Sequence, residues 1–364
     1  MSNTALLGSY GGQDNSSLLF RNKVINGDMR IDQRNAGTQS NTVATQYHVD
    51  RWNYLGTTAS KFTIQKSAVA PSGFTSSLLL TSSSAYAISG TADWLALRHV
   101  IEGFNVADLA WGTANAQAVS LSFWTRSSLT GTFGGSIMND AANRSHPFTY
   151  SISVANTWEY KTVVIPGDTS GTWATDNTAG MRINFSVGAG TSQKSAAGSW
   201  TAGAFWGGAT GTVDLCATNG ATLYITGVQL EAGPTATPFE RRPYSVELGM
   251  CQRYTAVYGG RDTYEYVGIA IASTGGTVAY AAVTLPVQMR NRATLVSSVG
   301  AFRLDDRTNS FPVTSIALNP SSLFIGDKTV EYLITVSGGL TAKMPYFLEA
   351  NNDLTARLII SAEL

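Results

Sequence analysis

The sequence predicts an all-β protein with a large jelly-roll or β-sandwich domain, a short helix and a smaller C-terminal β-sandwich. From Val24 onward, short alternating stretches of apolar and polar residues are interrupted by Gly, Ser, Asn or Pro. Interruptions about 8–12 residues apart are typical of sandwiches and jelly rolls. Only the segment 245–258 repeats its apolar residues with helical spacing. These two observations define the fold class.

Four regions follow along the chain. Residues 1–23 are small and polar, include Gly11-Gly12 and show no sustained period, so we expect a flexible N-terminal arm. The arm has neither the basic start nor the apolar segment of a secretory signal. We assign residues 24–244 to the jelly roll, 245–258 to a helical junction and 259–364 to the C-terminal β-sandwich.

The strands of the large domain are predicted from alternation. In residues 119–125, for example, Val119, Leu121 and Phe123 share one face. The Asn219-Gly220 pair predicts a two-residue hairpin turn. In the strand that follows, the apolar phase slips by one residue at Gly227, which predicts a β-bulge. The predicted strands span residues 78–80, 119–125, 149–154, 158–165, 181–187, 212–217 and 222–230, and residues 188–211 are predicted to form a long surface loop.

The helix is predicted from its ends and its apolar face. Ser245 is a suitable N-cap, and Gly259-Gly260 is expected to end the helix. Leu248, Cys251, Tyr254 and Tyr258 recur on one side. The residues after this helix return to short alternating strands.

Composition excludes several classes of function. Lys and Arg number 24 and Asp and Glu number 24, so the net charge is zero. Neither a broad basic face for nucleic acid nor a polybasic membrane patch is expected. No apolar run approaches the ~18 residues of a membrane span. Two cysteines, Cys216 and Cys251, provide neither a disulfide framework nor a cysteine-rich metal site, and we expect buried thiols.

No pattern of catalytic residues emerges. His48, His99 and His146 are widely spaced and form no metal-binding motif, so we interpret them as structural. The sequence contains no nucleophile elbow and no phosphate-binding loop. Two carboxylates suffice for glycoside hydrolysis, so that reaction stays open. Its candidate carboxylates are Asp140, Glu159, Asp168 and Asp214. The long β-helix repeats of glycan-cleaving phage spikes are missing from the sequence, and we predict no enzyme, no cofactor and no metal.

Aromatic residues give the sharper hypothesis. The chain has eight Trp and fifteen Tyr, and aromatic faces with polar neighbours are suited to sugars. We interpret Trp52, Trp124 and Trp158, in or beside strands, as structural. Trp173, Trp200 and Trp206 lie in Gly/Ser/Thr-rich stretches, which makes them our candidates for binding a glycan or a partner. The alternative is that the loop folds back and buries these rings as a satellite cluster.

Two motifs carry a resemblance. The first is residues 26–34 (Asn-Gly-Asp-Met-Arg-Ile-Asp-Gln-Arg), followed by Asp50-Arg51-Trp52. The second is residues 227–233 (Gly-Val-Gln-Leu-Glu-Ala-Gly), continuing through 236–244 (Ala-Thr-Pro-Phe-Glu-Arg-Arg-Pro-Tyr) and 251–254 (Cys-Gln-Arg-Tyr). The chain resembles bacteriophage tail-fibre and virion appendage proteins that carry a carbohydrate-binding-module-like jelly roll. The match brackets residues 24–258, and the arm resembles cyanophage structural proteins. In such proteins an aromatic residue often follows Gly-Asp, a Trp often precedes Gln-Arg and a second Tyr is common after Arg-Tyr. This chain has Met29, Asp32 and Thr255 at those positions.

The resemblance implies a non-enzymatic virion protein that attaches to a host-surface glycan. The arm would dock to other virion proteins. Alternatives are a capsid or tail decoration protein (a head fibre or knob) without receptor binding, and a glycan hydrolase. We interpret the motif residues as scaffold, and the most prominent are Asp50, Arg51, Trp52, Glu231, Phe239, Glu240, Arg242, Pro243 and Arg253.

Self-association is a further expectation. Sparse charge and zero net charge give little protection against association, and phage fibres are typically homotrimers. We therefore predict a homotrimer in which the helix 245–258 and the C-terminal strands lie near the threefold axis. Exposed faces of Tyr254 and Tyr258 would pack there.

Overall fold

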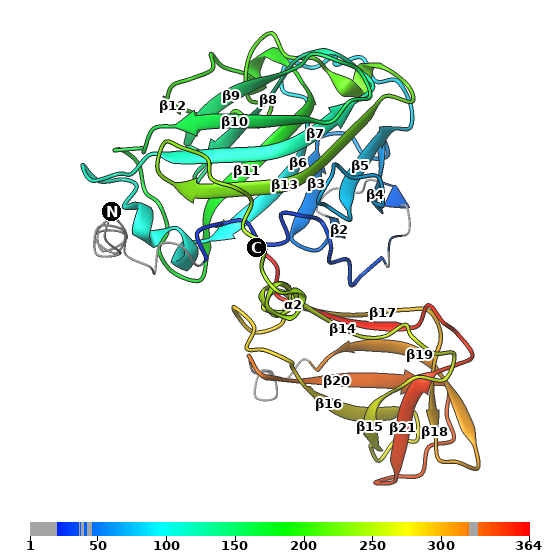
Figure 1. Ribbon diagram of the computed structural model, residues 1–364. Helices are drawn as coiled ribbons and strands as arrows, with labels where there is room; N and C mark the ends of the chain where they lie inside the picture. Colours follow the sequence, from blue (N-terminus) through cyan, green and yellow to red (C-terminus); the bar gives the residue numbers. More distant parts are fainter. Residues whose placement is uncertain (1–19, 36, 38–39, 42–45, 320–326) are drawn as a thin grey trace, which may run out of the picture. The chain divides into compact units, whose positions relative to one another are not determined.

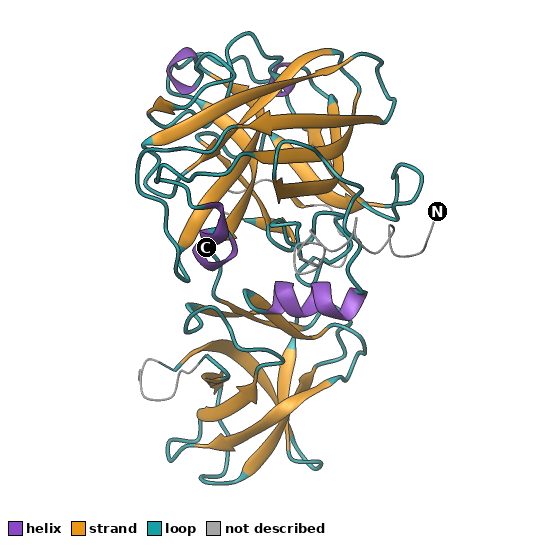
Figure 2. Cartoon of the chain, turned by 60° about the vertical axis from the view of Figure 1, so that its left-hand side comes forward, coloured by secondary structure: helices purple, strands orange, loops and turns teal. Residues whose placement is uncertain are grey.

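The chain is strand-rich and divides into two compact units. The structure, a computed structural model, describes residues 20–35, 37, 40–41, 46–319 and 327–364. One unit comprises Met1–Arg30 and Gly37–Arg242, and the other Ile31–Ala36 and Pro243–Leu364. The described residues contain one α-helix, α2 (Tyr244–Gln252), besides strands, loops and short 3-10 helices (Figure 2). The predicted all-β class is confirmed. Most of the predicted N-terminal arm, residues 1–19, lies outside the described residues.

The first unit is a sandwich of two antiparallel sheets (Figure 1). The six-stranded sheet has, in order, β1 (Ser40–Asn41), β4 (Phe62–Ser67), β5 (Ser77–Ser82), β13 (Thr222–Ala232), β7 (Val119–Ser127) and β10 (Glu159–Ile165). The seven-stranded sheet has β12 (Thr201–Ala202), β9 (Arg144–Ile152), β8 (Gly131–Met138), β11 (Ala179–Ala189), β6 (Trp94–Glu102), β3 (Trp52–Gly56) and β2 (Tyr47–Val49). In the described residues, four 3-10 helices lie in the connections between strands, at Gly103–Asn105, Ala107–Leu109, Thr191–Gln193 and Leu215–Ala217.

Alternation along the strands builds the core between the sheets. On β7, Leu121 and Phe123 are buried, as the sequence pattern predicts. Phe123 meets Phe185 of β11 edge-to-face across the sandwich, with ring centres 5.1 Å apart. Because such aromatic pairs bury large apolar areas, they fix the two sheets together, and the opposite face of β7 is left for other roles.

Two local predictions require correction. The segment 212–217 is not a strand, because Leu215 and Cys216 are buried side by side and form part of a 3-10 helix. Gly220 does adopt a turn conformation with φ 76°, but without a preceding strand the turn closes no hairpin. The bulge at Gly227 is confirmed: φ is 61° there, and the β13–β7 register shifts between Thr226 and Gln229.

The predicted helix 245–258 is too long. The helix α2 ends at Gln252, and β14 (Thr255–Gly259) pairs with β22 (Arg357–Ser361) instead. Pairing with a strand about one hundred residues away overrides the local helical spacing, a tertiary effect that periodicity does not register. Pro243, rather than Ser245, occupies the N-cap position. Tyr254 is fully buried, so it offers no exposed face to a trimer axis.

The second unit combines a three-stranded sheet with a closed barrel. The sheet has β14, β22 and β17 (Leu295–Val299) in the order β14-β22-β17. The barrel has β15 (Tyr266–Ala272), β16 (Val278–Thr284), β20 (Thr329–Val336), β19 (Ser310–Leu318), β18 (Phe302–Asp305) and β21 (Pro345–Ala350). β15 pairs with both β16 and β21, which closes the barrel and leaves it without an edge strand.

The segment around residue 33 belongs to the second unit, whereas the sequence places it in the jelly roll. The Gln33 side chain donates to the carbonyl of Thr255 at 2.9 Å. Arg34 forms an ion pair with Glu363 at 2.7 Å. These side-chain bonds tie an N-terminal segment to the start of β14 and to the last residues of the chain. Among the residues that the structure describes, no helix has the length and hydropathy needed to cross a membrane.

Candidate functional site

Trp173, predicted to bind a glycan or partner, is instead part of an aromatic cluster. Its side chain is only 8% exposed. The ring packs edge-to-face against Trp111 at 4.7 Å and Trp200 at 5.5 Å. The indole nitrogen of Trp173 donates to the carbonyl of Ser170 at 3.2 Å. A ring enclosed in this way has no face free for a sugar, so the satellite-cluster alternative holds for Trp173.

Trp200 and Trp206 are half-buried and have different surroundings. Trp200 also contacts Trp111, at 5.2 Å, and its indole nitrogen donates to the carbonyl of Pro166 at 2.7 Å. Trp206 stacks on Trp94 of β6 with ring centres 4.9 Å apart and an interplanar angle of 16°. The guanidinium carbon of Arg182 lies 5.5 Å from the Trp206 ring centre. Trp206 is therefore a second aromatic surface, which experiments must separate from the site described below.

The three histidines are all buried in the first unit. Burial lowers the pKa of His48 to about 4 and lowers the pKa of His146. The pKa of His99 lies well below its ordinary value, first because of burial and second because of the charge of Arg51. At neutral pH these imidazoles are uncharged core groups. Within the described part of the chain, no group of three or more His, Cys, Asp and Glu residues is placed to hold a metal ion.

The four candidate carboxylates each have their own basic partner. Asp168, which is buried, forms an ion pair with Arg144 at 2.6 Å. Ion pairs also join Arg182 to Asp140, Lys161 to Glu159 and Lys194 to Asp214. Each of these carboxylates thus sits in an ion pair of its own.

The outer face of the six-stranded sheet carries a different group of aromatic rings. Trp124 on β7 and Tyr160 on β10 are direct cross-strand partners, and their ring centres are 5.4 Å apart. Trp124 follows the buried Phe123 and therefore points away from the core. Tyr160 is 43% exposed. Adjacent outward positions on paired strands thus place two rings side by side.

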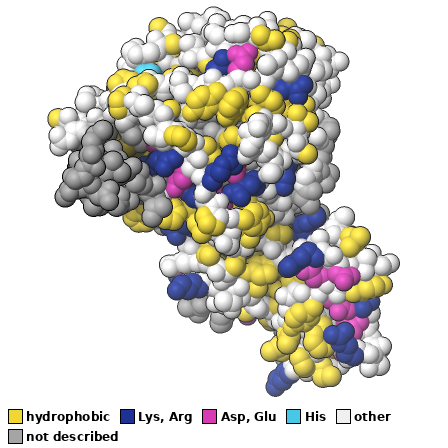
Figure 3. All heavy atoms as spheres, viewed as in Figure 1, with side chains coloured by type: hydrophobic (Ala, Val, Ile, Leu, Met, Phe, Trp, Pro, Cys, Tyr) yellow, Lys and Arg dark blue, Asp and Glu magenta, His cyan; other side chains and the backbone are white. Residues whose placement is uncertain are grey.

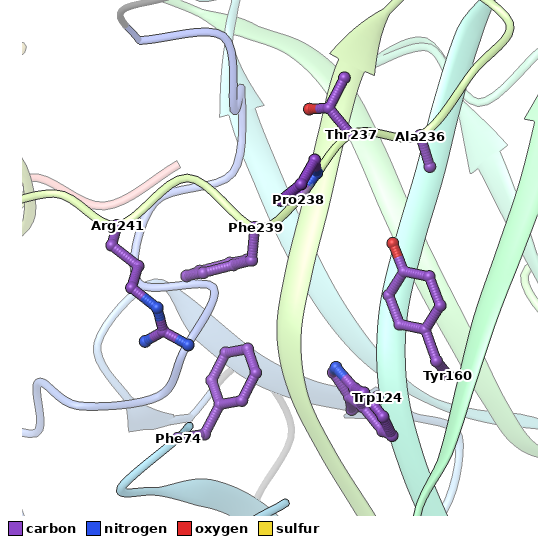
Figure 4. A pocket seen from close by; sticks show the side chains of 8 residues that line it. All are labelled: Phe74, Trp124, Tyr160, Ala236, Thr237, Pro238, Phe239 and Arg241. Atoms are coloured by element: carbon purple, nitrogen blue, oxygen red, sulfur yellow. The ribbon is translucent and has the colours of Figure 1, made fainter. Parts of the chain in front are cut away.

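Two loops add a wall to this pair of rings. Phe74 comes from the β4–β5 connection and Phe239 from the segment after β13, and their rings pack edge-to-face at 5.3 Å. The guanidinium of Arg241 lies against both rings, 4.6 Å from the centre of Phe74 and 5.8 Å from that of Phe239. The open pocket between these rings has a volume of about 460 Å³ and is also lined by Ala236, Thr237 and Pro238 (Figure 4). We call it the aromatic pocket.

The β-bulge provides space for these rings. Gly227 lies in β13, between β5 and β7. A β-carbon at this position would lie 2.7 Å from Cζ of Phe74 and 3.2 Å from Cδ1 of Trp124. Both the positive φ and the close approach require glycine. The irregularity that the sequence predicts therefore leaves room for two of the rings that line the pocket.

The segment 236–241 is fixed to β13 by buried polar groups. The Glu231 carboxylate accepts hydrogen bonds from the backbone N–H and the hydroxyl of Thr237, both at 2.7 Å. The Gln229 amide oxygen accepts from the backbone N–H of Glu240 at 2.7 Å. The Glu240 carboxylate in turn accepts from the backbone of Phe20 and Asn22. These bonds hold Phe239 in place from both sides.

The other motif residues lie in the interior or at element ends. Asp50 and Arg51 are buried, and Arg51 donates to the carbonyl of Val100 at 2.6 Å. The indole of Trp52 donates to Asn26 and packs on His99 at 4.8 Å. The Arg242 side chain donates to the backbone carbonyl of Val24. Arg253 is the C-cap residue of α2.

The same sheet face extends beyond the aromatic pocket. Arg126 and Tyr224 are cross-strand partners on β7 and β13, and the guanidinium lies 5.2 Å from the Tyr224 ring centre. Trp158, next to β10, meets Tyr224 edge-to-face at 6.0 Å. This second aromatic group lies two positions along β7 from Trp124, a displacement of about 7 Å. The face therefore presents several rings with polar groups between them.

The polar groups of the aromatic pocket are mainly hydrogen-bond donors. In the described part of the chain, the indole nitrogen of Trp124, the phenol of Tyr160 and the guanidinium of Arg241 have no hydrogen-bond or ion-pair partner. Tyr160 and Trp124 direct these atoms toward the segment 236–239 (Figure 4). Among the described residues that line the pocket, none carries a carboxylate. An apolar concave site of this size with a few convergent polar groups is suited to a small ligand or one unit of a polymer.

Comparisons with known proteins found similar chains among solved structures alone. No protein-family model and no curated protein matches the chain. Similar solved structures include the tailspike protein 4 enzymatically active domain of bacteriophage CBA120, at 14% identity and a TM-score of 0.30. The match covers 58% of this chain and only 22% of the tailspike chain. A carbohydrate-binding module of family 4 matches at 12% identity and a TM-score of 0.28, over 58% of this chain and 99% of the module.

A xylan-binding module of Paenibacillus barcinonensis matches at 8% identity and a TM-score of 0.28, over 55% of this chain and 97% of the module. The solved structures similar to this chain thus include carbohydrate-binding modules and a phage tailspike domain. What the aromatic pocket binds has to follow from its own residues.

Proposed function

We propose that the chain is a non-enzymatic phage virion appendage, a tail fibre or receptor-binding protein that attaches to a host-surface glycan through the aromatic pocket. The observation that carries this proposal is the pocket itself. It combines the rings of Phe74, Trp124, Tyr160 and Phe239 with free donor groups. Sugar rings present C–H faces to aromatic rings and hydroxyl oxygens to donors. By analogy with bases on aromatic side chains, stacking is worth about 1–3 kcal/mol per ring.

The virion assignment is supported by the motif residues. Segments 227–233 and 236–244, which resemble phage appendage proteins, include the bulge at Gly227 and the wall residue Phe239. The part of the sequence that carries the resemblance therefore also builds the pocket. In this proposal residues 1–23 dock the protein to the virion and the pocket is turned toward the host.

A homotrimer remains the assembly that we propose, with a different contact surface. Tyr254 is buried, but the barrel of the second unit exposes Tyr266, Ile269, Ile271 and Tyr280. On adjacent strands, Ile271 faces Tyr280 and Ile269 faces Phe347. Figure 3 shows hydrophobic side chains gathered on this side of the second unit. An exposed apolar patch of this kind is typical of an interaction surface.

The proposed function is tested by binding of the full chain to host-envelope polysaccharides in affinity gel electrophoresis. We expect retardation by a host polysaccharide and its loss in the double variant Trp124→Ala/Tyr160→Ala. Trp206→Ala is the matched control, because Trp206 is a half-buried ring outside the pocket. If Trp206→Ala alone lost binding, the glycan site would instead lie beside the seven-stranded sheet, where Trp206 stacks on Trp94.

Two further outcomes would overturn parts of the proposal. Binding to virion particles without binding to any envelope fraction would favour a decoration protein. Release of new reducing ends from a bound polysaccharide would show a glycan hydrolase.

A further inference from the structure

We infer that the aromatic pocket selects an acidic glycan, binding the carboxylate of a sugar through Arg241. This inference rests on the proposed glycan-binding function and specifies its ligand. Arg241 is the one charged residue among the eight that line the pocket. The ligand class therefore depends on what this guanidinium is able to bind.

Arg241 is held in place without using its hydrogen-bond donors. Its guanidinium stacks near Phe74 and Phe239, and Figure 4 shows it beside these two rings at one end of the pocket. Stacking on an aromatic face leaves the N–H groups at the edge of the guanidinium plane available. The side chain is exposed. A carboxylate entering the pocket thus finds an arginine that has already lost much of its rotational freedom.

Other arginines of the first unit show the contrast. Arg21 forms an ion pair with Glu231, Arg144 with Asp168 and Arg242 with Glu240. For Arg241, the described residues provide neither an ion pair nor a hydrogen bond. An arginine fork matches a carboxylate through two parallel hydrogen bonds, which are stronger than bonds between neutral groups. Arg241 therefore lies at the pocket with its N–H groups free to bind a carboxylate.

The surrounding charges favour an anion further. The nearest carboxylates in the sequence are committed elsewhere: Glu240 accepts from the backbone of Phe20 and Asn22, and Glu231 from Thr237. The free groups at the other end of the pocket, the indole N–H of Trp124 and the phenol of Tyr160, donate to ring and hydroxyl oxygens. We place the sugar face on Trp124 and Tyr160, with its carboxylate at the Arg241 end.

The test compares acidic polysaccharides with their own carboxyl-reduced forms, so that each pair differs only in the carboxylate. Polygalacturonate and alginate are the probes, and affinity is measured by gel electrophoresis with the full chain. We expect the acidic form to bind at least about tenfold more tightly than the reduced form at low salt, as for a charge-assisted pair. The difference should shrink at high salt.

Variants separate this inference from the proposed function. Arg241→Ala should remove the preference for the acidic form, and Arg241→Lys should keep part of it. Arg307→Ala is the matched control, since Arg307 also lies over an aromatic ring, Phe347 at 4.1 Å, in the second unit. Equal binding of acidic and reduced forms, or an unchanged preference in Arg241→Ala, would overturn the inference alone. Failure of both forms to bind would also overturn the inference alone, whereas binding that Trp124→Ala leaves intact would overturn the proposed function as well.

Discussion

Gly227 lies directly against Phe74, so closely that a β-carbon on Gly227 would be 2.7 Å from Cζ of the ring. The bulge in β13 and the loop before β5 thus fit together only because position 227 has no side chain. Phe74 in turn packs on Phe239 and supports Arg241. One backbone irregularity thereby determines the shape of the aromatic pocket.

Replacing Gly227 by alanine should abolish glycan binding while the fold persists. The substitution places a methyl group against Phe74 and Trp124, and the left-handed backbone adds about 1–2 kcal/mol of destabilisation. Gly220→Ala is the matched control: its φ is 76°, and nothing lies within 4 Å of the added carbon. We expect similar losses of stability from the backbone in both variants, measured by urea unfolding, but loss of binding only in Gly227→Ala. Full binding by Gly227→Ala would show that the pocket is not shaped by this contact.

Trp173→Ala should destabilise the first unit without affecting glycan binding. The ring is buried against Trp111 and Trp200. Removal of a buried aromatic side chain typically costs about 3–5 kcal/mol. Thermal unfolding together with affinity electrophoresis at a temperature where the variant is folded will check both parts. Reduced binding with unchanged stability would restore the interpretation of Trp173 as a binding residue.

The first unit should lose stability as the pH falls below about 6.5, the ordinary pKa of histidine. Burial lowers the pKa of His48 to about 4 and that of His99 well below its usual range, so the unfolded chain takes up protons first. The contribution of these histidines to the free energy of unfolding is therefore present in full above about pH 6.5. It is lost progressively as the pH falls toward their folded-state pKa values. Between pH 7 and pH 5 we expect His48 alone to account for a loss of about 2 kcal/mol in the free energy of unfolding.

Urea unfolding at several pH values measures this slope, with His48→Gln as the comparison. The variant should show a smaller pH dependence between pH 5 and 6.5, a range in which carboxylates with ordinary or lowered pKa values stay largely ionised. An identical slope in the variant and the parent chain would contradict the assignment to His48.

Mass photometry should find particles of three times the 38.6 kDa chain mass. The double variant Ile269→Lys/Ile271→Lys should shift the mass to that of one chain, because it puts two charges on the exposed barrel face. Leu354→Lys is the control, since Leu354 is also exposed in the second unit but lies outside the barrel strands. A single-chain mass for the parent protein at micromolar concentration would exclude the trimer.

The sequence predicts six strands of the first unit, at β5, β7, β9, β10, β11 and β13, but it misses others such as β6 and β8, in which most residues of both faces are buried. The alternation of Val119, Leu121 and Phe123 identifies β7, and the phase slip identifies the bulge at Gly227. The same alternation contains a signal for the site. Trp124 follows Phe123 and therefore has to point outward, although its position within a strand led us to interpret it as structural.

The rest of the pocket depends on contacts between distant segments. Phe74 and Phe239 are separated by more than one hundred and sixty residues, and no local pattern predicts that they pack together. The end of α2 and the position of Arg34 likewise depend on pairing with the last residues of the chain. Trp173 is buried because its loop folds back onto Trp111 and Trp200. The small residues around it allow many loop conformations, so the sequence does not predict this one.

The indole N–H signal of Trp124 tests the central claim most directly. The chain has eight tryptophans, and the Trp124 signal is assigned in a ¹⁵N-labelled sample as the one lost in Trp124→Phe. If the aromatic pocket binds glycan, titration with a bound oligosaccharide will shift the Trp124 signal in a saturable manner and leave the signal of the buried Trp173 unchanged. A titration that moves the signals of Trp94 and Trp206 while Trp124 stays fixed would contradict the account.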